Sequence, residues 1–398
     1  MKDLSRIKNI VISYMENRSF DHLIGYLNLP GNHPHWDSIE GITKAMHYYT
    51  GSTHRPHPLT ADQIQPDPPH ERENVDLQMN SPGKAMDGFV SSYLKAFPDA
   101  RGDAVMEYCG PKNVYVTDFL ARNFAVCDHW HACLPASTLP NRLMAMSGYA
   151  LVDRTPNSIF ELTRNLFYDD PDDLVYDWLG SRGVSWRLYY SNSFFFMQMP
   201  RMLKRYEDDI SSQNLFRPIK RLIEDFNAGD VAQVTFVEPL YEDDYRRNNQ
   251  QATDDHPPAP LTGGQRFLNM IWQAVKAPGV WENLLWVLSY DEHGSIFDHV
   301  SPPAIATDAP PKALYIEGFK TLGVRVPAIL ISPYVEPGSI CSKLFDHTSV
   351  LKFLGEKFDV GKRYSRLVDD RRVESISDCL SDALLAPLAQ VAGPPDGP

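Results

Sequence analysis

Short apolar runs recur along the chain, and the segments between them carry apolar residues at a helical period. Apolar runs of this length predict strands that are buried on both faces of a largely parallel sheet. They cover residues Ile7–Ser13, Phe124–Cys127, Trp186–Tyr190, Val234–Val237, Leu284–Ser289 and Val326–Ile331. Helices are expected over Met86–Phe97, Val116–Asn123, Leu215–Asn227, Gly264–Val275 and Thr348–Phe358. The alternation predicts an α/β fold, a three-layer sandwich with helices on both faces of the sheet.

Three segments do not follow these patterns. Residues 54–72 are rich in proline and histidine, and residues 241–260 are polar, acidic and then rich in proline. Both are expected to be long surface loops. The remaining chain, residues 1–385, is expected to form a single domain, because 398 residues lie within the range of one large α/β domain. Residues 386–398 are expected to be a flexible tail.

Charge and composition narrow the classes of partner. The formal net charge is −13, and no Lys/Arg-rich tract is present, which argues against nucleic acid and gives no attraction to anionic membranes. No apolar stretch approaches the roughly 18 residues of a membrane span. The N-terminus shows no signal-like apolar segment, so we expect a cytoplasmic protein. Five cysteines, none in a C-x-x-C pair, suit a reducing compartment better than a disulfide framework.

Two acidic corners share the same position relative to a strand. Glu16 and Asn17 follow the first predicted strand, and Asp291 and Glu292 follow the strand at 284–289. Ligands of open α/β sheets bind beyond the carboxyl ends of the strands. Carboxylates gathered at one site repel one another, and a bound cation relieves this repulsion. The alternative is that each is a solvated loop carboxylate, the commonest fate of Asp and Glu.

Thr138 precedes a helix whose first turn contains Pro140. Its hydroxyl can cap that helix, which is the ordinary role of a threonine at this position. A helix N-terminus also binds phosphate, so the less common alternative is that Thr138 attacks phosphorus when a metal ion stabilises its alkoxide. Arg142, one turn further on, can pair with a phosphate oxygen or with an acidic neighbour.

Several histidines stand in polar, loop-like settings, and most of them follow or precede a carboxylate. A carboxylate beside an imidazole can orient it as an acid–base group or a metal ligand, although a lone histidine usually has no such role. These histidines are His70, His256 after Asp255, His293 after Glu292, His299 after Asp298, and His347 after Asp346.

Together these segments resemble the motifs of the bacterial phosphatidylcholine-type phospholipase C and acid phosphatase family, in the family's order and over roughly residues 7–358. The matching segments are Glu16–His22, Thr138–Arg142, Asp255–Pro258, Ser289–Val300, Val326–Val335 and Asp346–Val350. The resemblance implies an alkaline-phosphatase-like fold, a single metal site and a phosphorylated-enzyme intermediate.

The resemblance also implies roles for individual residues. Glu16, Asn17, Thr138, Asp291 and Glu292 would surround one divalent metal ion, with Thr138 also the nucleophile. His70 and His256 would contact phosphate or protonate the leaving group. The residues that would support the metal ligands are Arg142, Glu238, Asp255 and His293. The oxygen-rich donor set favours Ca²⁺ or Mn²⁺, while related phosphatase sites accept Zn²⁺ or iron.

The chain departs from the family in four respects. The usual Gly-Gly after the Asp-Glu-His step is Gly294-Ser295 in this chain. The serine side chain leaves less room for the backbone to approach closely at this position. The stretch Ser81–Phe89 carries an insertion relative to the family, and the export signal and the extra C-terminal β region of secreted members are missing from this sequence.

Two activities remain open on these residues. One is a phosphodiesterase of phospholipase C type, which acts on a phospholipid or a similar small ester; the other is an acid phosphatase that uses the same site. The aromatic stretch Tyr189–Met197 could line a choline-accepting pocket or belong to the core. A sulfatase is disfavoured, because it needs Cys or Ser where Thr138 stands. The oligomeric state is not readable from the sequence.

Overall fold

The computed structural model describes residues 3–43, 48–49, 53–60, 63–80, 85–155, 174–191, 206, 208, 212–241, 251–359 and 363–395. Its centre is a seven-stranded sheet with the order β6-β11-β10-β1-β9-β7-β8. The strands are β1 (Asn9–Met15), β6 (Ala125–Val126), β7 (Trp186–Tyr190), β8 (Phe216–Pro218), β9 (Val234–Val237), β10 (Leu284–Tyr290) and β11 (Ala328–Ile331). Neighbours from β10 through β8 pair in parallel, and β11 pairs antiparallel with both β10 and β6.

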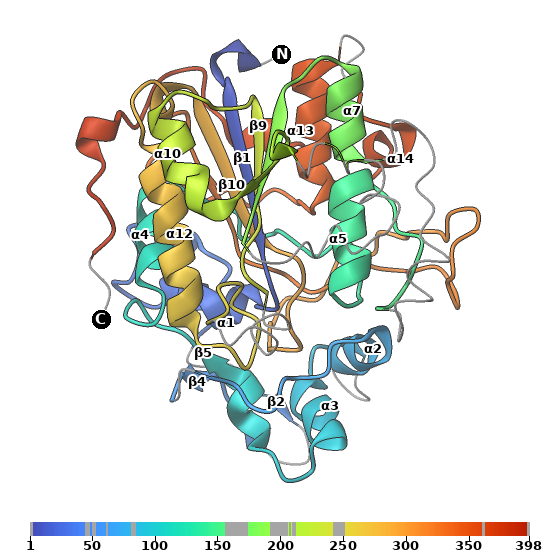
Figure 1. Ribbon diagram of the computed structural model, residues 1–398. Helices are drawn as coiled ribbons and strands as arrows, with labels where there is room; N and C mark the ends of the chain where they lie inside the picture. The colour runs from blue at the N-terminus through green and yellow to red at the C-terminus, as the bar shows by residue number, and fades with distance from the viewer. Residues whose placement is uncertain are drawn as a thin grey trace.

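Helices cover both faces of this sheet, which confirms the expected three-layer α/β arrangement (Figure 1). One layer contains α5 (Thr138–Ser147), α7 (Val175–Ser181) and α13 (Thr348–Phe358), with α14 (Arg366–Asp369) beside α13. The opposite layer contains α4 (Tyr115–Asn123), α10 (Leu222–Asn227) and α12 (Leu261–Val275). Central strands are apolar on both faces for this reason: all seven residues of β10 are buried.

Smaller elements gather beyond the carboxyl ends of the parallel strands (Figure 1). They are α1 (Phe20–Leu23), α2 (Arg72–Met79), α3 (Phe89–Ala96) and two short strand pairs, β2 (Tyr48–Tyr49) with β3 (Thr53–His54) and β4 (His57–Pro58) with β5 (Glu107–Tyr108). Helices α2 and α3 contribute Val75 and Phe89 to a separate apolar cluster, which also contains the buried Phe297. This group of elements lies over the edge of the sheet at which the acidic corners were expected.

Two predicted helices begin later than the sequence pattern indicated. The expected helix over 215–227 starts only at Leu222, because Phe216–Pro218 forms β8 and a 3-10 turn follows. Pro218 disfavours helical backbone at the residue before it, so the expected helix does not extend through residue 217. The helix expected from Met86 begins at Phe89, since Met86 has a left-handed φ of 60°. Helix α2 and helix α7 were not predicted at all.

The expected loops are only partly without regular structure. Within 54–72 the chain forms β4, and within 241–260 the described residues 251–260 form no helix or strand. The expected tail is docked at its start, where the carbonyl of Ala386 accepts a hydrogen bond from Trp281 Nε1 at 3.0 Å, and a 3-10 turn follows at Leu388–Gln390. No helix in the described part of the chain has the length and apolar character needed to cross a membrane.

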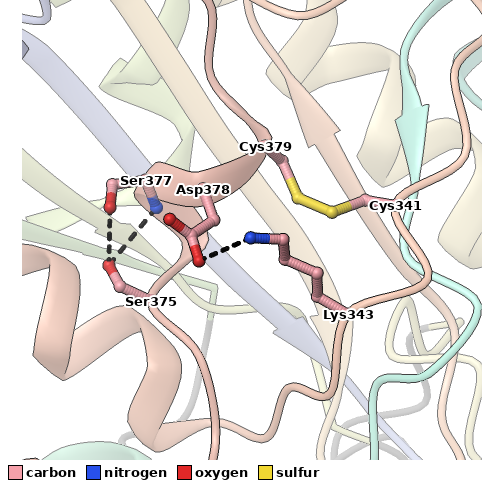
Figure 2. The surroundings of a disulfide bond; sticks show 6 residues. All are labelled: Cys341, Lys343, Ser375, Ser377, Asp378 and Cys379. Carbon is pink, nitrogen blue, oxygen red and sulfur yellow. Dashed lines mark hydrogen bonds and ion pairs between the residues drawn. A yellow bond between two sulfur atoms is a disulfide. The ribbon is translucent and has the colours of Figure 1, made fainter. Parts of the chain in front are cut away.

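One pair of cysteines corrects the sequence expectation. Cys341 and Cys379 form a disulfide across 38 residues, and an ion pair of 2.8 Å between Lys343 and Asp378 lies beside it (Figure 2). The chain therefore does carry a disulfide, although it has an odd number of cysteines. The bond joins the strand-like segment before α13 to the segment that follows α14. Cys109, Cys127 and Cys133 are buried and carry reduced thiols.

Candidate active site

The two acidic corners meet because β1 and β10 are neighbours in register. Met15 lies opposite Tyr290, so both strands end at the same level. The amide of Asp291 donates to the carbonyl of Met15 at 3.0 Å, and the amide of Arg18 donates to the carbonyl of Glu292 at 3.1 Å. The chain therefore leaves both strands at the same level. The two acidic corners lie close together, as their matching positions at the strand ends predicted.

Asn17 turns sharply at this point. Its φ is 58°, a left-handed conformation that asparagine tolerates better than most residues. Its backbone amide donates a hydrogen bond to Asp291 Oδ1 at 3.2 Å. Gly294 packs against the back of this turn, where a Cβ would lie 2.3 Å from the carbonyl oxygen of Asn17. The turn is thus fixed by the opposite corner of the site.

Thr138 is the first residue of α5 and does not cap it. The capping position belongs to Ser137, whose hydroxyl donates to Glu71 at 2.8 Å and makes no hydrogen bond to the helix. The hydroxyl of Thr138 donates instead to Asn17 Oδ1 at 3.4 Å. The capping interpretation of Thr138 is therefore wrong, and its hydroxyl faces the acidic corners.

Arg142, one turn along α5, lies within the cluster of carboxylates. Its guanidinium is 1% exposed and approaches Asp291 at 3.3 Å, Glu16 at 3.4 Å and Glu238 at 3.6 Å. It also donates to the carbonyl of Tyr14 at 3.1 Å. The pairing with acidic neighbours that the sequence allowed for Arg142 is therefore present.

His256 and His70 complete this side of the site. His256 Nδ1 lies 3.1 Å from Glu16, and its Nε2 lies 3.3 Å from Asp67. Burial opposes the charged form of His256, but the hydrogen bonds to the two carboxylates outweigh it and raise the pKa well above its usual value. His70 Nδ1 donates to the carbonyl of Pro68 at 2.8 Å, and the side-chain nitrogen of Asn17 lies 3.3 Å from its Nε2.

The carboxylates of the site are buried together, and this changes their pKa values. Burial, supported by the charge of Asp291, raises the pKa of Glu292 to about 8 against the opposing effect of His70. Burial and the charge of Glu16 raise the pKa of Asp291. Burial likewise raises the pKa of Glu238 to about 7. Among the described residues, Glu292 Oε1 is buried without a hydrogen-bond partner, so the site has an oxygen donor available to a cation.

Other groups of side chains near the site have the composition and spacing of metal ligands. Asp67, His70 and His256 form one such group, and Glu16, Asp254 and His256 form another. Asp254 was not among the predicted site residues, and it accepts a hydrogen bond from the backbone amide of His256 at 3.0 Å. Its position in the run Asp254-Asp255-His256 was the available signal, but only the fold shows which carboxylate faces inward. The donor set as a whole fits a divalent cation.

Two expected supporting residues occupy the outer side of the site. His293 Nε2 lies 2.8 Å from Gln78 Oε1, and its Nδ1 lies 3.3 Å from Glu292. Burial and the neighbouring His70 lower the pKa of His293 to about 3, so it is neutral. The carboxylate of Asp255 accepts a hydrogen bond from the Tyr290 hydroxyl at 2.6 Å and thus supports the strand end rather than facing the cluster.

The remaining carboxylate–histidine steps have structural partners. His347 donates from Nε2 to the carbonyl of Asp291 at 2.7 Å and accepts from Trp130 Nε1 at 3.2 Å. His299 pairs with Asp21 at 2.6 Å. The aromatic stretch is divided: Tyr189 is a core residue, and residues 192–197 lie outside the described part of the chain.

Comparisons with known proteins identify the family of the chain. The model of the Phosphoesterase family matches residues 7–361. The chain is 30% identical to non-specific phospholipase C3 of Arabidopsis thaliana, over 89% of this chain and 70% of the relative. It is 27% identical to phospholipase C A of Mycobacterium tuberculosis, over 90% of this chain and 74% of the relative.

Among solved structures, the chain is similar to the phosphonate monoester hydrolase of Agrobacterium radiobacter, at 9% identity and a TM-score of 0.36, over 88% of this chain and 73% of that chain. This likeness is too low to add to the assignment, which rests on the family model and the sequence relatives. The chain belongs to the Phosphoesterase family and is a hydrolase of phosphoric esters.

Proposed function

We propose that the protein is a metal-dependent phosphodiesterase of phospholipase C type, which acts through a phosphothreonine intermediate on Thr138. The observation that carries this proposal is the orientation of the Thr138 hydroxyl, which donates to Asn17 instead of capping α5. A buried hydroxyl at a helix N-terminus, turned toward carboxylates and histidines, suits a nucleophile.

The metal site would be formed by Glu16, Asn17, Thr138, Asp291 and Glu292. When bound, a divalent cation lowers the free energy of the threonine alkoxide and of the charged phosphoryl oxygens. The unpartnered Glu292 Oε1 and the raised pKa of Asp291 support this assignment. Arg142 would hold Glu16 and Asp291 at a fixed separation while the ion binds.

Two displacements describe the reaction. Thr138 Oγ1 forms a bond to phosphorus while the bond to the leaving-group oxygen breaks; the hydroxyl proton passes to a site carboxylate, and His256 donates a proton to the leaving oxygen. Water then attacks phosphorus and gives a proton to His256, the bond to Oγ1 breaks, and the carboxylate returns its proton to Thr138 Oγ1. His70 would contact the phosphoryl group across from His256, since the two imidazole rings are 5.5 Å apart.

A leaving group with room to bind would favour a diester over a monoester. A cavity of about 510 Å³ is lined by Arg72, Met79, Pro135 and Phe319 among others. Arg72 follows His70 by two residues and Pro135 precedes Thr138 by three, so the cavity adjoins the segments that carry both. The names of the relatives, which are phospholipases C, point to the same class of substrate.

The test compares metal-loaded enzyme on nitrophenyl phosphorylcholine, bis-nitrophenyl phosphate and nitrophenyl phosphate, with an acid quench to trap phosphothreonine. We expect the choline diester to be preferred, and Thr138→Ala to lose the adduct and the turnover while remaining folded. Ser137→Ala is the matched control, because it removes the neighbouring hydroxyl and should keep activity. Full activity of Thr138→Ala would exclude the mechanism, and preference for the monoester would make the protein an acid phosphatase.

A further inference from the structure

Ser295 has a backbone conformation that serine rarely adopts. It follows Gly294 in the loop after β10, has a φ of 57° and is 2% exposed. A left-handed φ is unfavourable for a residue with a Cβ, so a glycine would occupy this position with less strain. The side chain of Ser295 must therefore provide something that glycine lacks.

The hydroxyl of Ser295 joins two segments that are far apart in sequence. It donates to the carbonyl of Pro69, the residue before His70, and accepts from Gln78 Nε2 at 2.6 Å. Gln78 is fully buried, and its Oε1 lies 2.8 Å from His293 Nε2. One hydroxyl thus connects the backbone at His70 with the loop that carries Asp291 and Glu292.

The position of the His70 ring depends on this backbone. His70 Nδ1 is bound to the carbonyl of Pro68, so the imidazole is oriented by its own segment. Within the described residues, a second and longer hydrogen bond to this segment comes from Gln78 Nε2 on α2, which lies 3.4 Å from the carbonyl oxygen of Pro69. A shift of residues 68–70 away from Ser295 would move the imidazole relative to Asn17 and Glu292.

We propose that Ser295 is a positioning residue, which holds the His70 segment against the Asp291–His293 loop at the cost of a strained backbone. The inference rests on the proposed function, because it gives His70 a role in phosphoryl transfer. Small displacements of a catalytic group lower the rate of the chemical step much more than substrate affinity.

Three variants separate positioning from stability. Ser295→Gly removes the hydroxyl and the strain, Ser295→Ala removes the hydroxyl and keeps the strain, and Ser295→Thr keeps the hydroxyl and increases the strain. With nitrophenyl phosphorylcholine or the preferred nitrophenyl ester, we expect Gly and Ala to lower kcat about tenfold or more with little change in KM. Tm should be highest for Gly, and Thr should retain kcat at a lower Tm.

A purely structural role predicts the opposite pattern, in which kcat follows Tm and the glycine variant is as active as the wild type; that result would overturn the inference. A second measurement uses His70→Asn, in which adding Ser295→Gly should cause no further loss of kcat. Additive losses would also overturn it. Neither outcome depends on Thr138, so failure of the nucleophile assignment would be seen separately in the Thr138→Ala enzyme.

Discussion

Met15 and Tyr290 lie directly opposite each other on β1 and β10, and both strands end at this pair. The chain leaves both strands at the same level. For this reason the backbone amide of Asn17 donates a hydrogen bond of 3.2 Å to the carboxylate of Asp291. The geometry of the site therefore follows from strand register. Substitutions that displace these strand ends should lower both catalytic activity and stability. Substitutions away from the strand ends should change stability without changing activity.

Gly294→Ala should disrupt the strand end. The new Cβ would lie 2.3 Å from the carbonyl oxygen of Asn17, in addition to the strain of a φ of 62°. Gly279→Ala is a matched control, since Gly279 has a φ of 79° and no atom within 4 Å of the added Cβ. Chemical denaturation should show a loss of about 1–2 kcal/mol for Gly279→Ala and a clearly larger loss for Gly294→Ala, with activity reduced only in the latter. Equal losses would show that the contact with Asn17 is unimportant.

Arg142→Met should leave Glu16 and Asp291 buried without their positive partner. Removing one partner from a buried ion cluster typically costs about 3–5 kcal/mol. We expect a lower Tm for the chelated protein and a larger rise of Tm on addition of Mn²⁺ than in the wild type, because the site becomes more negative. The control is Arg366→Met, whose ion pair with Asp370 is exposed and should contribute little. An unchanged Tm for Arg142→Met would contradict the prediction.

The disulfide should contribute to stability without affecting the chemistry. A crosslink that closes a segment of 38 residues is expected to stabilise the fold by about 3–4 kcal/mol. Cys341→Ser and Cys379→Ser should therefore lower Tm to the value that a reducing agent produces in the wild type, and the reducing agent should have no further effect on either variant. Activity measured well below Tm should not change. A wild-type Tm that does not respond to reduction would argue against the bond.

His299 should make stability depend on pH on the alkaline side. Burial lowers the pKa of His299, but the adjacent Asp21, its hydrogen bond and Asp298 outweigh this and Arg325, and raise the pKa to about 9; Glu40 also lies at 2.9 Å. A raised pKa in the folded state means that the stabilisation is complete below the unfolded value of about 6.5 and is lost as pH rises through about 9.

The size of this effect is about 3 kcal/mol at most, from the difference between the two pKa values. Urea denaturation should show that the free energy of unfolding of the wild type decreases between about pH 6 and about pH 9.5. The same decrease should be much smaller in His299→Gln. A parallel decrease in both proteins would assign the effect to other groups.

The strands were predictable because central strands of a mainly parallel sheet are apolar along their whole length. The runs at 186–190 and 234–237 match β7 and β9 residue for residue. Strand β8 was missed because it has only three residues, of which Phe216 alone is buried. Helix α2 was missed because its sequence, from Arg72 to Met79, is mostly polar and only three of its residues are buried.

The site was predictable where it depends on strand ends and not where it depends on distant loops. Asn17 and Asp291 could be placed from the sequence, since each follows an apolar run. The contact of Ser295 with Pro69 and the role of Gln78 join segments more than 200 residues apart, and no local pattern encodes such contacts. For the same reason, the sequence did not show that Asp67 reaches His256.

The guanidinium of Arg142 lies among three carboxylates. This arrangement has a consequence for how the newly synthesised chain folds. A site made only of acids would resist assembly until an ion arrived, so that folding would depend on the metal supply of the compartment. Here a covalently attached cation is already in place when α5 packs against the strand ends. For the proposed metal site, this means that folding and metal loading can occur at different times, and that the protein can remain folded without the ion.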